Sequence, residues 1–243
     1  TKIDYTDRMI QWARKRVIEL EKEDLCGFIF KSRSPSSGMG RVKVYNEKGI
    51  PAKKGVGIFA RIFMEHFPLI PVEEDGRLHN PMLRENFIER IFAFKRWREA
   101  LVEKQSRGNL VGFHTKHKML ILSHSPEYHR IIGKLIAQAK DVPLRELYDK
   151  YQKLLMEALR LKSTTRKNAN VMTHIMGYFK KQLSADEKQE LLEIIDLYRG
   201  GTIPLIVPIT LINHYVRKYD QPYLQEQYYL HPHPLELQLR NHV

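Results

Sequence analysis

The first eighty residues alternate between helical and strand-like hydrophobic patterns. Met9, Ala13 and Val17 lie at four-residue intervals behind Thr6, so a helix capped by Thr6 is expected there. Short apolar or alternating runs predict strands at residues 25–30, 41–45 and 69–72, and helical spacing predicts a second helix at residues 55–67. Helices and strands in this order favour a layered α/β domain with a mainly parallel sheet. Because such sheets usually contain more strands, the chain is expected to begin partway through a domain.

From Asn80 onward the pattern is helical. Apolar residues at helical spacing predict helices at residues 83–104, 128–139, 144–158, 171–183 and 204–218. Another helix is expected between the capping-box residues Ser184 to Glu187 and the stop signal at Gly200. The predicted fold class is α+β, with a partial α/β layered amino-terminal part and an all-α carboxy-terminal domain. We expect the α/β part at residues 1–79, a connecting long helix at 80–108 and the helical domain at 109–243.

The composition is that of a globular protein. The chain has 243 residues, of which 42% are hydrophobic and 28% charged. No apolar stretch approaches about 18 residues and no signal peptide is recognisable, so a soluble cytoplasmic protein is expected. The single cysteine, Cys26, excludes an internal disulfide framework and any site of several thiolates within this chain. Its place in a strand-like run predicts a buried, inert thiol.

The net charge of +13 is unevenly distributed. Residues 107–167 hold 13 Lys and Arg against 5 Asp and Glu, whereas residues 168–243 hold 7 against 8. A concentrated positive field attracts polyanions, which makes nucleic acid the expected partner. The alternative is a solvated basic surface that serves only solubility.

Several basic side chains on the predicted helices are candidates for RNA binding, because donors in a band can contact successive phosphates. These candidates are Arg96, His114, Lys116, His117, Lys118, Arg130, Lys134, Arg166 and Lys167. Trp97 offers a stacking platform for an unpaired base, but a core position is more typical of tryptophan in a helix. Lys180 and Lys181 suit either RNA contact or the negative end of a helix dipole. No Asp or Glu accompanies the histidines at ligand spacing, so no metal site is predicted.

The segment at residues 31–45 reads KSRSPSSGMGRVKVY and connects two predicted strands. Gly38 and Gly40 are expected to permit positive φ angles, and such a backbone can direct N–H groups at an anion or a cofactor. The alternative is a simple turn.

Long strings in both parts of the chain resemble a bacterial family. SPSSGMGRVKVY (34–45), KKGVGIFAR (53–61) and PVEEDGRL (71–78) resemble TudS-type thiouracil desulfidases. HTKHKMLILSHSPEYHRIIGKL (114–135), NVMTHIMGYFKKQLSADEKQELL (170–192) and IPLIVPITLINHYVRKY (203–219) resemble the YbgA domain. Fusions of the two are known as RudS, and the resemblance implies removal of sulfur from 4-thiouridine in tRNA.

The resemblance also implies a four-iron–four-sulfur cluster held by three cysteines, with one iron open to the sulfur of the base. The family loop reads Ser-Pro-Ser-Cys-Gly, and Ser37 occupies the cysteine position here. The other two cysteines and an acidic catalytic residue of the family belong to segments before Thr1. The chain is therefore expected not to bind the cluster. Ser34 matches the family serine that assists at the substrate, and its alternative role is that of a turn residue.

Three functions remain open at this point. The chain is the carboxy-terminal part of a fused tRNA 4-thiouridine desulfidase, a non-catalytic nucleic-acid-binding protein, or a helical module that binds an acidic protein. The sequence leaves the oligomeric state open and predicts no contact with a membrane.

Overall fold

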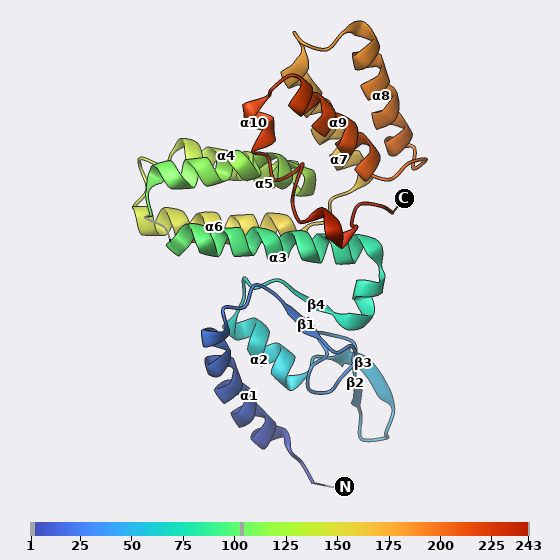
Figure 1. Ribbon diagram of the computed structural model, residues 1–243. Coiled ribbons are helices and arrows are strands. Elements are labelled where there is room, and N and C mark those ends of the chain that lie inside the picture. Colours follow the sequence, from blue (N-terminus) through green and yellow to red (C-terminus); the bar gives the residue numbers. More distant parts are fainter. Residues whose placement is uncertain (1–2, 103–104, 243) are drawn as a thin grey trace. The chain divides into compact units, whose positions relative to one another are not determined.

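The computed structural model describes residues 3–102 and 105–242 and confirms the α+β fold class (Figure 1). The chain forms two compact units, of which the first ends at Phe94 and the second begins at Lys95. The division falls inside helix α3 (Pro81–Val102), within the segment predicted as a connecting helix. Lys104, where that helix was expected to end, lies outside the described residues.

Unit 1 contains short strands and a few helices before α3. Its elements are α1 (Thr6–Leu20), the 3-10 helix η1 (Glu21–Glu23), β1 (Phe28–Phe30), β2 (Val42–Tyr45), β3 (Pro51–Gly55), α2 (Ile58–His66), β4 (Val72–Glu74) and the 3-10 helix η2 (Asp75–His79). The N-cap position of α1 is Tyr5 and not Thr6. The amide of Thr6, the first residue of the helix, donates to the carboxylate of Asp4 at 2.8 Å.

The strands of unit 1 form two separate pairs. Strands β1 and β4 are parallel, with Phe28 opposite Val72, so parallel pairing is confirmed for two of the three predicted strands. Strands β2 and β3 form an antiparallel hairpin, which the sequence pattern did not predict. The segment PAKKG of β3 has neither apolar alternation nor β-branched residues, so it carries little strand signal. The turn between the strands places Gly49 at φ +73°.

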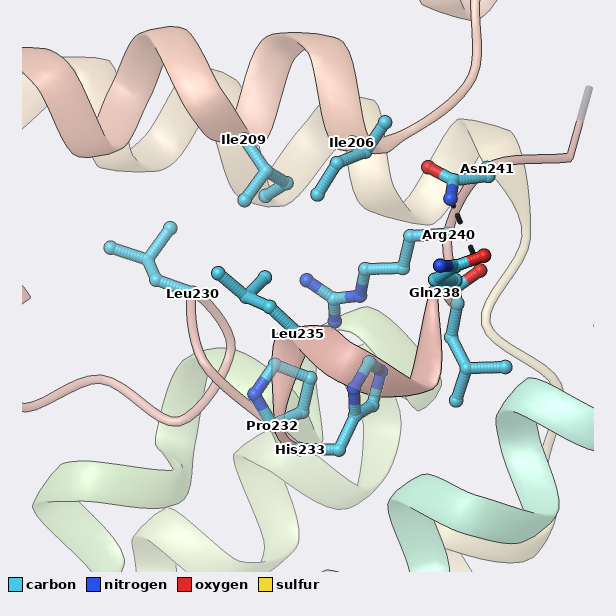
Figure 2. Close-up of a pocket in the computed structure, with 10 residues that line it drawn as sticks. Ile206, Ile209, Leu230, Pro232, His233, Leu235, Gln238, Arg240 and Asn241 are labelled. Atoms are coloured by element: carbon cyan, nitrogen blue, oxygen red, sulfur yellow. Dashed lines mark hydrogen bonds between the residues drawn. The ribbon is translucent and has the colours of Figure 1, made fainter.

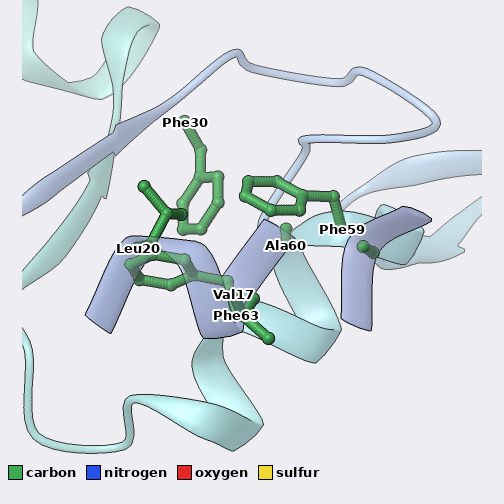
Figure 3. Packing of buried hydrophobic residues seen from close by; sticks show 7 residues of the cluster. Val17, Leu20, Phe30, Phe59, Ala60 and Phe63 are labelled. Atoms are coloured by element: carbon green, nitrogen blue, oxygen red, sulfur yellow. The ribbon is translucent and has the colours of Figure 1, made fainter. Parts of the chain in front are cut away.

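The core of unit 1 lies between α1, α2 and β1 (Figure 3). It is built from the buried residues Ala13, Val17, Leu20, Phe30, Phe59, Ala60 and Phe63. The ring of Phe63 meets that of Phe30 edge-on at 5.4 Å, a geometry that aromatic pairs favour. Cys26 is only half-buried, so its predicted burial is wrong. It precedes β1 and its thiol donates to the Asp24 carbonyl at 3.7 Å.

The described residues of unit 2 form helices joined by turns, followed by a largely irregular carboxy-terminal tail. After the end of α3, its elements are α4 (Arg107–His124), α5 (Pro126–Ala137), α6 (Leu144–Arg160), α7 (Thr165–Met176), the 3-10 helix η3 (Gly177–Phe179), α8 (Ala185–Arg199), α9 (Ile206–Lys218), α10 (Pro222–Gln225) and the 3-10 helix η4 (Leu235–Leu237). Helix α4 begins at Arg107 because the Ser106 hydroxyl accepts from the Asn109 amide at 3.1 Å and caps the helix.

Local signals define the ends of α8 as predicted. The Ser184 hydroxyl accepts from the amide of Glu187, and the Glu187 carboxylate accepts from the amide of Ser184. Beyond the helix, Gly201 adopts a φ of +74°, which few residues other than glycine reach.

Trp97 lies in the core of unit 2, as the more typical of its two roles predicted. Its side chain is fully buried, and its ring stacks on Tyr151 at 5.2 Å and meets Phe113 at the same distance. It therefore offers no surface to an unpaired base.

None of the helices in the described part of the chain combines the length and the apolar character that crossing a bilayer would require.

Candidate functional site

The serine-rich loop of unit 1 is a closed turn built around Ser34. The Ser34 hydroxyl accepts from the amides of Ser36 at 3.3 Å and Ser37 at 3.2 Å, and the Ser34 carbonyl accepts from the amide of Gly38 at 2.8 Å. The next amide, that of Met39, donates to a carboxylate oxygen of Glu74 at 2.9 Å. All four consecutive N–H groups thus have partners within the unit, so the loop has the hydrogen-bonding pattern of the simple turn and not that of an open anion cradle.

Neither Gly38 nor Gly40 has a positive φ, and Gly38 instead permits close packing. The left-handed positions are Arg33 and Arg41, at φ 60° and 55°, so the expectation for Gly38 and Gly40 is wrong. A Cβ on Gly38 would lie 2.7 Å from the Val42 side chain and 2.9 Å from the Ser34 carbonyl. Gly38 is therefore required because no side chain fits.

Helix α2 begins directly against this loop. Gly57, its N-cap, donates to the Gly38 carbonyl at 2.7 Å, and the amide of Ala60 donates to the Ser36 carbonyl at 3.1 Å. A Cβ on Gly57 would approach the Ser36 carbonyl to 2.5 Å. The first turn of α2 thus uses its free N–H groups to fix the loop.

The side chains of the loop present hydroxyl groups. The hydroxyls of Ser34 and Ser36 lie 3.0 Å apart, and those of Ser36 and Ser37 lie 3.4 Å apart. All three residues are half-buried. Ser34 and Ser37, the predicted catalytic and cluster-ligand positions, are therefore brought together in one turn of hard oxygen donors.

In unit 2, Arg96 and His117 belong to a column of stacked side chains. The His117 ring stacks on Phe113 at 3.9 Å and is tilted against Tyr228 at 4.4 Å. The Arg96 guanidinium lies over the Tyr228 ring, 4.0 Å from its centre. Arg96 donates to Nε2 of His117 at 3.2 Å and to the Pro232 carbonyl at 2.9 Å. The column fastens the carboxy-terminal tail to α3 and α4.

His117 is neutral in this setting. Its Nε2 accepts from Arg96, so its Nδ1 must carry the proton that it donates to the Phe113 carbonyl at 2.8 Å. Burial, together with the charge of Arg96, lowers the pKa of His117 well below its usual value. Only 1% of its surface is exposed, so it does not face a phosphate in this structure.

His114 and Lys167 also contact other parts of the unit. His114 is buried beside the Tyr151 hydroxyl, 3.3 Å from its Nδ1, and burial lowers the pKa of His114 to about 4. Lys167 donates to the carbonyls of His124 at 2.6 Å and Lys162 at 2.9 Å, so it ties α7 to the ends of α4 and α6. His114 is therefore not at the surface, and Lys167 uses two hydrogen bonds within the unit.

The remaining candidates lie at the surface. Lys116 forms an ion pair with Glu226 at 3.0 Å. Arg130 and Lys134 on α5, and Arg166 on α7, are exposed, and none of the three has a carboxylate partner in residues 3–102 and 105–242. Lys118 is half-buried and its ammonium lies 4.9 Å from the centre of the Tyr223 ring.

Two tyrosines that the sequence pattern did not single out lie beside Lys118. The rings of Tyr178 and Tyr223 are stacked at 5.0 Å with an interplanar angle of 18°, although 45 residues separate them in the sequence. Tyr178 follows α7 and Tyr223 belongs to α10, so no local pattern indicates their contact.

The carboxy-terminal tail encloses a small apolar pocket against α9 (Figure 2). Its volume is about 110 Å³, and Ile206, Ile209 and Leu230 form much of its wall. The Arg240 guanidinium points toward it and donates to the Tyr229 carbonyl at 2.8 Å. This volume suits a few water molecules and not a substrate.

Comparisons with known proteins match both units. Residues 1–75 match the family model for 2-thiouracil desulfurase, and residues 118–234 match the model described as a protein of unknown function (DUF1722). The chain is 31% identical over 153 residues to the uncharacterized protein YbgA of Escherichia coli (strain K12). That alignment covers 63% of this chain and 90% of the Escherichia coli protein.

The chain belongs to the YbgA family. Its match to 2-thiouracil desulfurase over residues 1–75 adds a second part, so the architecture is that of a thiouracil desulfidase fused to a YbgA domain, as the resemblance implied. The serine loop lies within the desulfurase match and the exposed cations of α5 and α7 within the DUF1722 match. No solved structure matches the chain.

Proposed function

We propose that the YbgA unit binds tRNA and that the desulfurase segment forms part of a site for a thiolated uracil base. The observation that carries the RNA-binding half is the group of exposed cations Arg130, Lys134 and Arg166, which have no carboxylate partner in the described part of the chain. Unpaired cations on one unit are available to phosphates, whereas paired cations must first give up their carboxylates.

We infer that the residues of this chain do not suit an iron–sulfur cluster by themselves. The family's ligand position holds Ser37, whose hydroxyl is a hard donor that is far less acidic than a thiol. The single thiol, Cys26, lies before β1 and donates to the Asp24 carbonyl. Three thiolates are thus not available within this sequence.

Without a cluster, the serine loop can bind and orient a base. Hydroxyls at Ser34, Ser36 and Ser37 can donate to the oxygen or sulfur of a pyrimidine base, provided that the base displaces one of their mutual contacts. Because α2 fixes the loop backbone through Gly57 and Ala60, these hydroxyls are presented on a rigid frame. The loop is therefore proposed to position a base without activating it.

The RNA-binding half is tested by the salt dependence of tRNA affinity, measured by filter binding or fluorescence anisotropy. Each neutralised phosphate contributes about −0.7 to −0.9 to the slope of log K against log salt. We expect each of Arg130→Gln, Lys134→Gln and Arg166→Gln to make the slope shallower by about this amount. Lys188→Gln, which removes a charge from α8, is the matched control and should leave the slope unchanged. A slope near zero for the unmodified protein, or equal affinity for an acidic polypeptide, would favour a protein-binding module instead.

The desulfidase half is tested by restoring the cysteines that the family uses to hold the cluster. Ser37→Cys is combined with the cysteine-bearing family segments placed before Thr1, and the protein is reconstituted with iron and sulfide. We expect bound iron, a broad visible absorbance and loss of sulfur from thiolated tRNA. Reconstitution without any loss of sulfur would refute the desulfidase half and leave a non-catalytic RNA-binding protein.

A further inference from the structure

An open cavity lies on the YbgA unit beside the tyrosine pair. Its volume is about 480 Å³, within the range of sites that bind small molecules. It is lined by Asn170, Thr173, His174, Gly177, Tyr178 and Lys180. Every lining residue comes from α7, η3 or the residue after η3, so one rigid segment forms the wall.

The ring of Tyr178 forms an aromatic part of the cavity wall. Tyr223 covers one side of the Tyr178 ring in a parallel stack, while 37% of the surface of Tyr178 stays exposed. His174 meets the Tyr178 ring edge-on at 6.1 Å. A tyrosine held flat by a second tyrosine cannot easily turn away, so it is prepared for a planar ligand to stack on it.

Positive charge surrounds the same wall. The ammonium of Lys118 lies 4.9 Å from the centre of the Tyr223 ring, and Lys180 lines the cavity itself. Burial lowers the pKa of His129 on α5, and the charges of Lys118 and His174 lower it further. Neither Lys118 nor Lys180 has a carboxylate partner in residues 3–102 and 105–242.

We propose that this cavity binds one unpaired nucleotide of RNA, whose base stacks on Tyr178 and whose phosphate lies among Lys118, His174 and Lys180. The inference rests on the proposed function, because it assigns the unpaired part of the bound RNA to a particular site. An aromatic face beside uncompensated cations is the combination that single-stranded nucleic acids require, since every base has a π face and every linkage a negative charge. An acidic peptide would satisfy the cations but would leave the tyrosine face unused.

The site is tested with a short single-stranded oligouridylate and a fully paired RNA duplex of equal charge, using fluorescence anisotropy. Tyr178→Ala should weaken oligouridylate binding by about 5- to 150-fold, the range found for one stacked base, and should leave duplex binding unchanged. Tyr178→Trp keeps an aromatic face and should retain the affinity. Asn170→Trp fills the cavity from the exposed side of α7 and should weaken oligouridylate binding without removing the tyrosine pair.

Controls separate this inference from the proposed function. Tyr45→Ala removes another exposed tyrosine, on β2, and should change neither the affinity for oligouridylate nor that for the duplex. If tRNA binds with steep salt dependence but Tyr178→Ala and Asn170→Trp leave oligouridylate affinity unchanged, the nucleotide site is refuted and the proposed function stands. If the unmodified protein binds neither tRNA nor oligouridylate, the nucleotide site and the proposed function are both refuted. Equal loss of oligouridylate and duplex binding, or equal competition by polyglutamate of matched charge, would also refute the nucleotide site.

Discussion

Replacing His117 by alanine tests whether this histidine holds the protein together or contacts RNA. The change removes the hydrogen bond to the Phe113 carbonyl at 2.8 Å and the acceptor for Arg96 at 3.2 Å. It also removes ring contacts with Phe113 at 3.9 Å and Tyr228 at 4.4 Å. We expect a large loss of stability and no direct loss of phosphate contacts.

The size of this loss follows from the contacts that disappear. Each hydrogen bond contributes on the order of 1 kcal/mol, and each aromatic contact about 0.5 kcal/mol or more. The free energy of unfolding should therefore fall by about 3 kcal/mol. For a unit of this size, each kcal/mol lowers the melting temperature by about 2–4 °C, so a decrease of roughly 6–12 °C is expected.

Thermal melting followed by circular dichroism measures the effect, with tRNA affinity measured at a temperature where the variant is folded. His214→Ala removes an exposed histidine of the same unit and should change the melting temperature little. If His117→Ala melts like the unmodified protein and instead reduces tRNA affinity and its salt slope, the structural role assigned to His117 is wrong.

Three further predictions concern the loop, an interior histidine and a helix cap. Gly57→Ala should cost about 1–3 kcal/mol and increase amide exchange in the serine loop, because its Cβ would lie 2.5 Å from the Ser36 carbonyl; unchanged exchange contradicts this. His114 has a folded pKa of about 4 against 6.5 for the free group, so the unfolded chain binds the extra proton and stability should fall as the pH drops from about 6.5 to 4. His114→Phe should flatten that part of the pH profile, as measured by urea denaturation. Ser184→Ala should cost about 1 kcal/mol, whereas the exposed Ala185→Ser should not.

Local signals account for most of the fold that the sequence predicted. The apolar stripe of α5 and the capping box of α8 depend on residues within one or two turns, so the sequence alone contains them. Strand β3 depends on its pairing with β2, and its own residues carry little preference, so it was missed. Trp97 was predicted to be core because size and apolarity favour burial in most surroundings.

Whether a predicted site residue is exposed could be predicted only where the residues that pack against it are close in the sequence. The exposure of Arg130 and Lys134 follows from their position opposite the stripe of their own helix. The burial of His117 depends on Tyr228, which is more than one hundred residues away, and no pattern around His117 reveals it. The stack of Tyr178 on Tyr223 could not be predicted for the same reason, because the two residues are far apart in the sequence. The sequence therefore indicates whether a basic residue is exposed where its own helix decides this, but not where a residue far away in the sequence buries it.

The position of Trp97 determines how the helical part can be prepared for separate study. The similarity to DUF1722 begins at residue 118, yet Trp97 fills the space between Tyr148, Tyr151 and Phe113. A fragment cut at the start of that similarity would lack the indole and would expose aromatic rings that water avoids, so it should aggregate. A fragment meant to fold alone must start upstream of Lys95, and the sequence match underestimates the folding unit by more than twenty residues.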